Sequence, residues 1–322
     1  MGNKRISIII PTYNAGDDFK NVLKMIKQQR GSLSYELICV DSGSNDLTIE
    51  IARDFSARIF QIRKEDFNHG LTRNYGVSKA EGEYVVLMTQ DALPQDGNWL
   101  MSLVRCLEEN KIIAGAYSRQ VPRNDCNPFI RERLRDWFAG GEVRRIQGIE
   151  NLEELERLSP REKFKLFAFD NVSSCIRKDI WKRFPFEKRD FGEDLAWAKK
   201  VVERGYRIVF EPESVVIHSH NNSLWYEFKR VYLDHQGLNQ LIGIDLFPGF
   251  WKIFLAGFKE AIRLWGKIEG SYSWGERLYW KVYAFPYTLS QNIAQFLGSH
   301  SNNWLENVGW YGFIDRILKK GV

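Results

Sequence analysis

Short apolar runs rich in β-branched residues alternate with segments of helical periodicity through residues 6–88. Residues 6–10 form such a run and end at Pro11, as a buried strand does, whereas residues 17–29 place their apolar side chains on one helix face. The pattern predicts strands over 6–10, 35–40, 58–62 and 83–88, and helices over 17–29, 46–55 and 71–79. Strict alternation of this kind indicates βαβ units, and therefore an α/β fold with a Rossmann-like, mostly parallel sheet flanked by helices.

The remaining sequence changes character twice. Residues 123–165 are dominated by charged side chains, and we expect them to form a mobile helical or loop insert. The chain becomes apolar again from about residue 166, with two short predicted strands over 208–210 and 215–217. We therefore expect a catalytic-type domain over 1–245, which carries the insert, and a helical, aromatic-rich C-terminal extension over 246–322.

The C-terminal extension is both aromatic and basic. Residues 246–322 contain six of the eleven Trp residues and nine Lys or Arg against five Asp or Glu. Amphipathic helices of this composition can lie in a membrane interface. An apolar helical stripe can equally pack on the catalytic domain or on another subunit, and the sequence alone leaves both readings open.

Composition excludes several classes of protein. The net charge of +5 is too small to indicate a nucleic-acid partner, and we expect none. The four Cys residues form no C-x-x-C pair, so neither a disulfide framework nor a Cys-based zinc site is expected. No apolar leader follows Met1, and no run of about 18 apolar residues occurs. We therefore expect a cytoplasmic location, either free or in peripheral contact with the inner face of the plasma membrane. No G-x-G-x-x-G follows the first strand, which argues against a dinucleotide-dependent oxidoreductase.

Polar clusters follow three of the predicted strands, where ligands bind in parallel α/β sheets. They are Thr12-Tyr13-Asn14, Asp41-Ser42-Gly43-Ser44 and Thr89-Gln90-Asp91. A carboxylate such as that of Asp91 can hold a divalent cation or a ribose at this position. The alternative is an Asp that opens a turn before Pro94.

Three further groups suit chemistry on a charged substrate. Glu193 and Asp194 open a helix, where one carboxylate can accept a proton and the other can orient a hydroxyl, although acidic residues are common in a first helical turn. His218 and His220 share one side of a strand end and can ligate a cation or contact a phosphate, or can simply be exposed. Arg73, near a helix start after Gly70, suits a diphosphate, or is a solvated side chain.

In their order along residues 5–240, these blocks resemble the inverting, family-two glycosyltransferases of GT-A fold. The blocks are 8–14, 41–46, Arg73-Asn74-x-Gly76, 83–91, Gly192-Glu193-Asp194 and His218-x-His220. One departure is Thr89, which stands where the family has the first acid of its D-x-D motif. The Thr-Gln-Asp-Ala-x-Pro form, together with Phe67-x-His69-Gly70-x-x-Arg73-Asn74, is similar to bacterial rhamnosyltransferases that use dTDP-L-rhamnose.

The resemblance implies a role for each matched residue. Asp194 would be the general base, Glu193 would position the acceptor, and Asp91 with His218 or His220 would hold Mg²⁺ or Mn²⁺. The nucleotide-sugar would contact Thr12, Tyr13, Asn14, Asp41, Ser42, Arg73, Asn74, Gln90, Asp91 and Arg230. The insert over 123–165 would help form the acceptor side.

The resemblance also implies a reaction, which is transfer of a sugar, L-rhamnose in this subgroup, to a growing lipid-linked glycan of the cell surface, as in O-antigen. No Q-x-x-R-W motif occurs, which favours single transfers over polymerisation. Two alternatives are a transferase for UDP-galactose or a UDP-N-acetylhexosamine, and a non-catalytic nucleotide-sugar-binding scaffold. The oligomeric state is left open.

Overall fold

The computed structural model describes residues 6–31, 34–247, 249–268 and 272–321. Residues 1–5, where the sequence shows no apolar leader, lie outside this described part. The strands are β1 (Ile6–Thr12), β2 (Tyr35–Asp41), β3 (Arg58–Gln61), β4 (Tyr84–Met88), β5 (Leu93–Pro94), β6 (Ile113–Val121), β7 (Arg145–Gln147), β8 (Ser173–Arg177) and β9 (Arg207–Ile217).

Helices connect these strands and then continue alone to the C-terminus. They are α1 (Asp18–Lys27), α2 (Thr48–Asp54), the short 3₁₀ helix η1 (Lys64–Asp66), α3 (His69–Lys79), α4 (Trp99–Glu109), α5 (Pro128–Asp136), α6 (Leu152–Arg157), α7 (Pro160–Leu166), α8 (Lys178–Arg183), α9 (Glu193–Val202), α10 (Leu224–Ile242), α11 (Phe250–Trp265), α12 (Trp274–Asn307) and α13 (Tyr311–Lys319).

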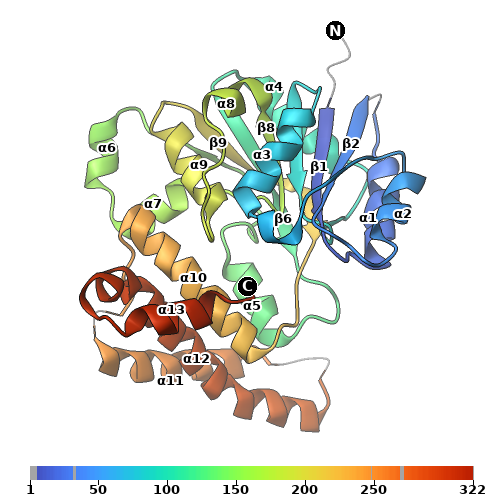
Figure 1. Ribbon diagram of the computed structural model, residues 1–322. Coiled ribbons are helices and arrows are strands. Elements are labelled where there is room, and N and C mark those ends of the chain that lie inside the picture. The colour runs from blue at the N-terminus through green and yellow to red at the C-terminus, as the bar shows by residue number, and fades with distance from the viewer. Residues whose placement is uncertain (1–5, 32–33, 248, 269–271, 322) are drawn as a thin grey trace.

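One sheet organises the described residues, with strand order β3-β2-β1-β4-β8-β6-β9-β5 and β7 paired to β9 (Figure 1). Strands β1 to β4, β6 and β9 run in one direction, whereas β5, β7 and β8 run against them. Helices α1, α2 and α4 cover one face of the sheet, and α3, α8 and α9 cover the other. The predicted α/β fold with a mostly parallel, helix-flanked sheet is confirmed.

The reversed strand β8 decides where the site can form. It lies between β4 and β6, and its first residue, Ser173, is opposite Met88 at the carboxyl end of β4. The start of β8 therefore meets the ends of β4, β6 and β9 at one edge of the sheet. The segment before β8 can contribute side chains there in the same way as segments that follow a parallel strand.

Two details differ from the sequence prediction. Residues 208–210 and 215–217 belong to one strand, β9, because the register shift between Ser118 and Arg119 of β6 accommodates the interruption after Glu211 as a bulge. Within 123–165, β7 joins the sheet and α5 packs on the C-terminal helices, where Phe129 contacts Trp280 and Tyr287.

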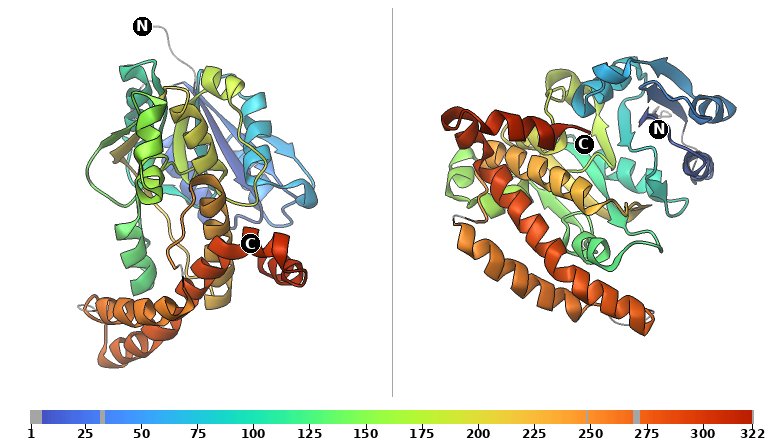
Figure 2. Two further views of the ribbon diagram at one scale, coloured as in Figure 1. Left: turned by 90° about the vertical axis from the view of Figure 1, so that its left-hand side faces the viewer. Right: turned by 60° about the horizontal axis from the view of Figure 1, so that its bottom comes forward.

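The C-terminal helices form a separate layer below the sheet (Figures 1 and 2). α10 packs along α12 and α13, and its Tyr232 is buried with Ala294 and Tyr311. Although the expected boundary at residue 245 assigned α10 to the first domain, α10 shares its apolar packing with the extension. This helix therefore connects the sheet to the C-terminal layer.

Candidate active site and metal centre

The first polar cluster is a rigid turn at the ends of β1 and β2. The Oδ2 atom of Asp41 accepts hydrogen bonds from the hydroxyls of Thr12 at 3.0 Å and Ser44 at 2.5 Å. Its Oδ1 atom accepts from the backbone N–H groups of Gly43 at 3.0 Å and Ser44 at 2.9 Å. Gly43 has a φ of +90°, which a side chain would strain. Thr12 and Asp41 are buried, so their network fixes the shape of this edge.

Backbone and amide bonds place the other members of this cluster. The amide of Gln90 accepts from the N–H of Tyr13 at 2.8 Å and donates to its carbonyl at 3.1 Å. Ser42 donates from its N–H to the carbonyl of Thr12, and Asn14 accepts from the N–H of Asn45. The structure thus joins the first and third predicted clusters, and it leaves the Tyr13 ring exposed at their junction.

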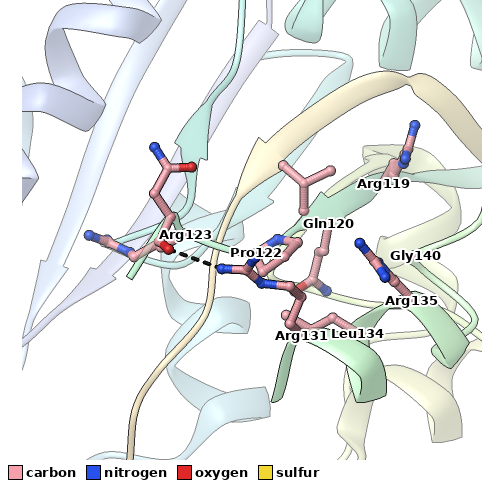
Figure 3. Close-up of a pocket in the computed structure, with 10 residues that line it drawn as sticks. Arg119, Gln120, Pro122, Arg123, Arg131, Leu134, Arg135 and Gly140 are labelled. Carbon is pink, nitrogen blue, oxygen red and sulfur yellow. Dashed lines mark hydrogen bonds between the residues drawn. The ribbon is translucent and has the colours of Figure 1, made fainter. Parts of the chain in front are cut away.

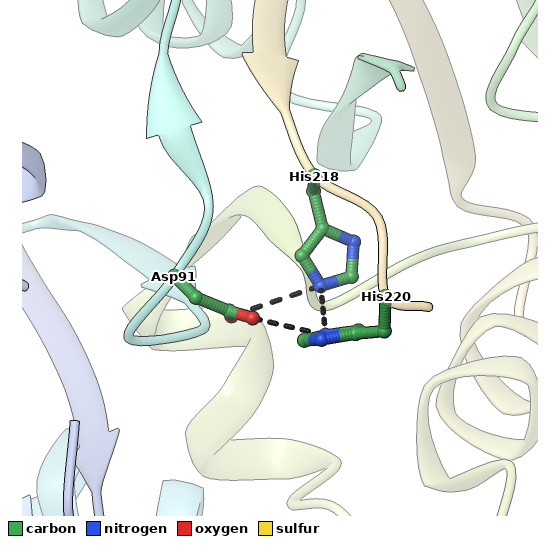
Figure 4. A group of neighbouring side chains, drawn as sticks. All are labelled: Asp91, His218 and His220. Carbon is green, nitrogen blue, oxygen red and sulfur yellow. Dashed lines mark hydrogen bonds and ion pairs between the residues drawn. The ribbon is translucent and has the colours of Figure 1, made fainter. Parts of the chain in front are cut away.

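Asp91, His218 and His220 come together at the next edge of the sheet (Figure 4). β5 pairs with the end of β9, and this pairing places Asp91 beside the histidines that follow Ile217. The Nε2 atom of His220 lies 2.9 Å from Asp91 Oδ2, and the Nε2 atom of His218 lies 3.6 Å from Asp91 Oδ1. The two Nε2 atoms are 3.1 Å apart. All three side chains therefore offer a ligand atom to a common point.

Gln120 fixes the orientation of the His218 imidazole. Its Oε1 atom lies 3.0 Å from His218 Nδ1, while its Nε2 atom donates to Asp170 Oδ2 at 2.5 Å. Because an amide oxygen only accepts, Nδ1 must carry the proton, and the lone pair is then on Nε2. Burial lowers the pKa of His218 to about 4, which keeps the ring neutral near pH 7. A neutral imidazole with a free Nε2 is the form that binds metal ions.

The same network continues from Gln120 to Asp194. Asp170 precedes β8, and its Oδ1 atom accepts from the N–H of Val172 at 2.9 Å. The N–H of the next residue, Asn171, lies 3.3 Å from Asp194 Oδ2. Hydrogen bonds therefore run from His218 through Gln120 to Asp170, and the backbone N–H of the next residue, Asn171, contacts the carboxylate at the start of α9.

Asp194 stands in the first turn of α9, after Gly192 has turned the chain with a φ of +74°. Its Oδ1 atom accepts from the N–H of Leu195 at 2.8 Å. Burial, reinforced by the negative charges of Glu193 and Asp170, raises the pKa of Asp194 well above its ordinary value. A carboxylate of raised basicity is suited to accept a proton.

Arg73 and Glu193 form a buried ion pair between α3 and α9. Their Nη1 and Oε1 atoms are 2.8 Å apart, and both side chains are almost fully buried. Asn74 is also engaged within the protein, because its amide bonds to both backbone groups of Phe186 and to the indole of Trp181. In this structure these three residues hold α3, α9 and the 181–186 segment together, and they border the site through Asp194.

A cavity of about 300 Å³ is lined by residues of β6, α5 and the segment between them (Figure 3). Gln120 lines it, and Arg123 reaches from it to the backbone carbonyl of Asp91 at 3.2 Å. Arg119, Arg131 and Arg135 also line it. Arg230 of α10 contributes positive charge beside it, where it opposes the rise in the pKa of the buried Asp170. Three of the lining arginines pair with carboxylates, Arg119 with Glu142, Arg123 with Asp18 and Arg135 with Glu132, so the positive charge of the cavity is partly neutralised.

Sequence reasoning missed Gln120, Asp170 and Asn171. Asp170 and Asn171 follow an apolar run, Phe167-Ala168-Phe169, and polar residues after such a run are typical of the end of a strand. They lie at the start of β8, however, and only the antiparallel direction of that strand brings them to the site. The predicted residues divide into a cluster around Asp41, a cluster around Asp91, and the Arg73–Glu193 pair beside Asp194.

Comparison with known proteins gives the family. The model of the family "Glycosyl transferase family 2" matches residues 7–169. The O-antigen chain rhamnosyltransferase RfbN of Salmonella typhimurium is 34% identical over 233 residues, which are 71% of this chain and 70% of that protein. WbaN of Salmonella anatum, also named an O-antigen chain rhamnosyltransferase, is 31% identical over 230 residues, 70% of each chain. The chain belongs to glycosyltransferase family 2.

Solved structures agree in fold. The mannosyltransferase PcManGT from Pyrobaculum calidifontis, in complex with GDP-Man and Mn²⁺, superposes with a TM-score of 0.53 at 17% identity and covers 98% of this chain and 84% of that one. Residues 1–349 of S. aureus TarS superpose with a TM-score of 0.51 at 15% identity, covering 93% and 91% of the two chains. The GT-A architecture is thereby confirmed.

Proposed function

We propose that this chain is an inverting, non-processive rhamnosyltransferase that moves L-rhamnose from dTDP-L-rhamnose to a hydroxyl of a lipid-linked cell-surface glycan. The names of the two Salmonella relatives, both O-antigen chain rhamnosyltransferases, support rhamnose as the sugar and an O-antigen chain as the kind of acceptor. The observation that supports the proposal is the placement of the Asp91–His218–His220 cluster near Asp194, a carboxylate of raised pKa: Gln120 bonds to both His218 and Asp170, and Asn171, which follows Asp170, contacts Asp194. A diphosphate-holding site and a proton acceptor are what a single displacement at an anomeric carbon requires.

The cluster fits a divalent cation. Its ligand atoms, one carboxylate oxygen and two imidazole nitrogens, lie within 4.8 Å of one another, and Gln120 leaves the Nε2 lone pair of His218 available. Mixed oxygen and nitrogen donors suit Mn²⁺ as well as Mg²⁺. When bound, the ion neutralises the charge that develops on the nucleoside diphosphate as it leaves.

The protein's own groups perform the remaining steps. Asp194 accepts the proton of the acceptor hydroxyl as that oxygen attacks the anomeric carbon from the face opposite the leaving diphosphate, which inverts the configuration. Glu193, held by Arg73, fixes the first turn of α9 and so positions Asp194. Asp41 and Thr12 shape the edge that receives the nucleotide base, and the exposed ring of Tyr13 offers it an aromatic surface.

The acceptor approaches from the side of the insert over 123–165. The arginine-lined cavity begins in β6 and extends into α5, directly beside the cluster that holds the donor's diphosphate. Guanidinium groups bind phosphates through paired N–H donors. Of the four arginines that line the cavity, Arg131 donates to the backbone carbonyls of Asn124 and Cys126 and pairs with no carboxylate of the described residues, so it is the best placed to bind an anion. A phosphate or other anionic group of the acceptor would therefore be held next to the donor.

Binding and slow hydrolysis across a panel of nucleotide-sugars, with Mn²⁺, Mg²⁺ or EDTA, test this function. We expect selective binding and hydrolysis of dTDP-L-rhamnose, both lost in EDTA. Selective turnover of a UDP-hexose or UDP-N-acetylhexosamine would refute the donor and retain the transferase. Tight binding of a nucleotide-sugar without turnover, even with lipid-linked glycan acceptors present, would indicate a scaffold instead.

A further inference from the structure

Helix α11 exposes a broad apolar surface in addition to the stripe that it buries. Ile253, Gly257, Ala261 and Leu264 are buried and face the layer that contains α12. Seven apolar side chains adjoin this stripe and remain exposed, namely Phe250, Trp251, Phe254, Leu255, Phe258, Ile262 and Trp265. At about 100° per residue these seven cover an arc of about 140°. A helix that only packed on its neighbour would show polar side chains over this arc.

The first half of α12 repeats the pattern. Trp274, Leu278, Tyr279, Val282 and Phe285 are exposed on one side of the helix. The two surfaces meet, because the rings of Phe258 and Phe285 contact edge to face at 6.4 Å. The indole N–H of Trp265 also donates to the carbonyl of Lys281 at 2.7 Å. We call these twelve exposed apolar residues of α11 and α12 the aromatic face.

Positive charge borders the aromatic face. Lys252 and Lys259 follow its edge on α11, and Lys281 lies beside it on α12. All three are exposed, and none forms an ion pair with any residue in the described part of the chain. Exposed Trp and Phe side chains with Lys at the border are typical of helices that lie in a lipid interface.

We propose that the aromatic face docks on an anionic lipid bilayer, with α11 and the first half of α12 lying in the plane of the interface. None of the helices in the described ranges is long and apolar enough to cross a bilayer, so contact through this face would be peripheral. The lower layer that carries the face packs against α5 and α10 (Figure 2). Residues of α5 line the arginine-lined cavity, and Arg230 of α10 lies near Asp170. A lipid-linked acceptor would thus reach the site from the same surface.

The charge favours a bilayer over a second copy of this chain as the occupant. In an isologous dimer each copy would bring its own unpaired Lys side chains to the same rim, and these like charges would repel. Anionic headgroups would instead neutralise them, at a gain of about fivefold in affinity per Lys. Trp and Tyr also retain polar N–H and O–H groups, which a headgroup layer can satisfy.

Co-sedimentation of the full chain with vesicles tests this proposal without any turnover. We expect binding to vesicles of phosphatidylcholine with about one-third phosphatidylglycerol, and weak binding to phosphatidylcholine alone. The double variant Trp251→Ser/Val282→Ser should lose at least about tenfold in affinity for both compositions, because it removes two of the most exposed apolar side chains. The variant Lys252→Gln/Lys259→Gln should lose affinity only for the anionic vesicles.

Val143→Ser supplies the matched control, since Val143 is 73% exposed and lies outside α11 and α12. It should bind vesicles as the native chain does, and all variants should keep the native melting temperature and dTDP affinity. Absence of binding to anionic vesicles, or binding that the Trp251→Ser/Val282→Ser change leaves intact, would overturn the proposal. Loss of a dimer in light scattering, without loss of vesicle binding, would assign the face to a second copy.

Discussion

Replacing Asp194 with Asn should lower the rate of sugar transfer by about 10²–10⁴-fold, the usual contribution of a general base. The change keeps the shape of the side chain, and its Oδ1 atom can still accept from the N–H of Leu195, although the 3.3 Å contact from the N–H of Asn171 to the second oxygen is lost. Removing a charge from a buried site that also holds Glu193 and Asp170 should not destabilise the fold. Steady-state kinetics with a nucleotide titration would therefore show a loss in kcat with an unchanged affinity for dTDP.

The pH profile of the native enzyme gives an independent check on Asp194. A base acts only when deprotonated, so transfer should fall as the pH drops through the raised pKa of Asp194, at a pH where an ordinary Asp is still ionised. Asp194→Asn should lack this acidic limb in its residual activity. Asp190→Asn, which changes an exposed carboxylate in the preceding loop, is the control and should retain native kinetics. Near-native turnover of Asp194→Asn would disprove the assignment.

Replacing Asp91 with Asn should reduce metal-dependent nucleotide binding by more than about 100-fold, because it removes the only carboxylate of the three-residue cluster. Loss of a residue that hydrogen-bonds to a metal ligand lowers metal affinity by about 10–100-fold, and loss of the ligand itself should lower it further. Calorimetric titration of dTDP with Mn²⁺ present measures the effect. In EDTA the variant and the native chain should bind dTDP equally weakly.

Gln120 separates a metal role from a general structural one. Gln120→Ala removes the acceptor that fixes Nδ1–H on His218 and should weaken Mn²⁺ affinity by about 10–100-fold with little effect in EDTA. Asp125→Asn, a change at an exposed carboxylate in the adjacent insert, should leave Mn²⁺ affinity unchanged. If Asp91→Asn bound dTDP with Mn²⁺ as tightly as the native chain, the ion would have to lie elsewhere.

The N-terminal half of the fold could be predicted because each of its strands and helices follows from the residue pattern of a single short segment. The strand predicted over 35–40 is β2, Tyr35–Asp41, and the helix predicted over 71–79 begins only two residues earlier, at His69. Alternation of buried strands and amphipathic helices leaves few ways to build a parallel sheet. The three polar clusters at the strand ends follow directly from that geometry.

The second half depends on long-range pairing, which a single sequence does not encode in any local pattern. The insertion of β8 between β4 and β6 with reversed direction depends on pairs 85–93 residues apart with β4 and 57–61 residues apart with β6. Gln120 consequently lacks a local signal, and the apolar run before Asp170 suggests a strand end although Asp170 precedes a strand. The sequence predicts two strands around Glu211, because Pro212 interrupts the apolar run. In the structure β9 continues through this interruption as a bulge.

Within the candidate site, the sequence predicted that Asp91 and the two histidines lie together but did not predict the partner of Arg73. Asp91, His218 and His220 were predicted together and lie together. Arg73 was expected at a diphosphate, but in the structure its guanidinium pairs with Glu193. Sequence spacing could not reveal this pair, because the two residues are 120 positions apart and meet only when α9 packs beside α3.

Anomalous diffraction from crystals grown with Mn²⁺ and a non-hydrolysable dTDP-L-rhamnose analogue tests the central claim most directly. We expect a manganese peak bounded by Asp91, His218 and His220 and in contact with the diphosphate. The anomeric carbon should present its free face toward Asp194, with room for one acceptor oxygen between them. A manganese peak at other residues, or an anomeric carbon whose free face is turned away from Asp194, would contradict the account.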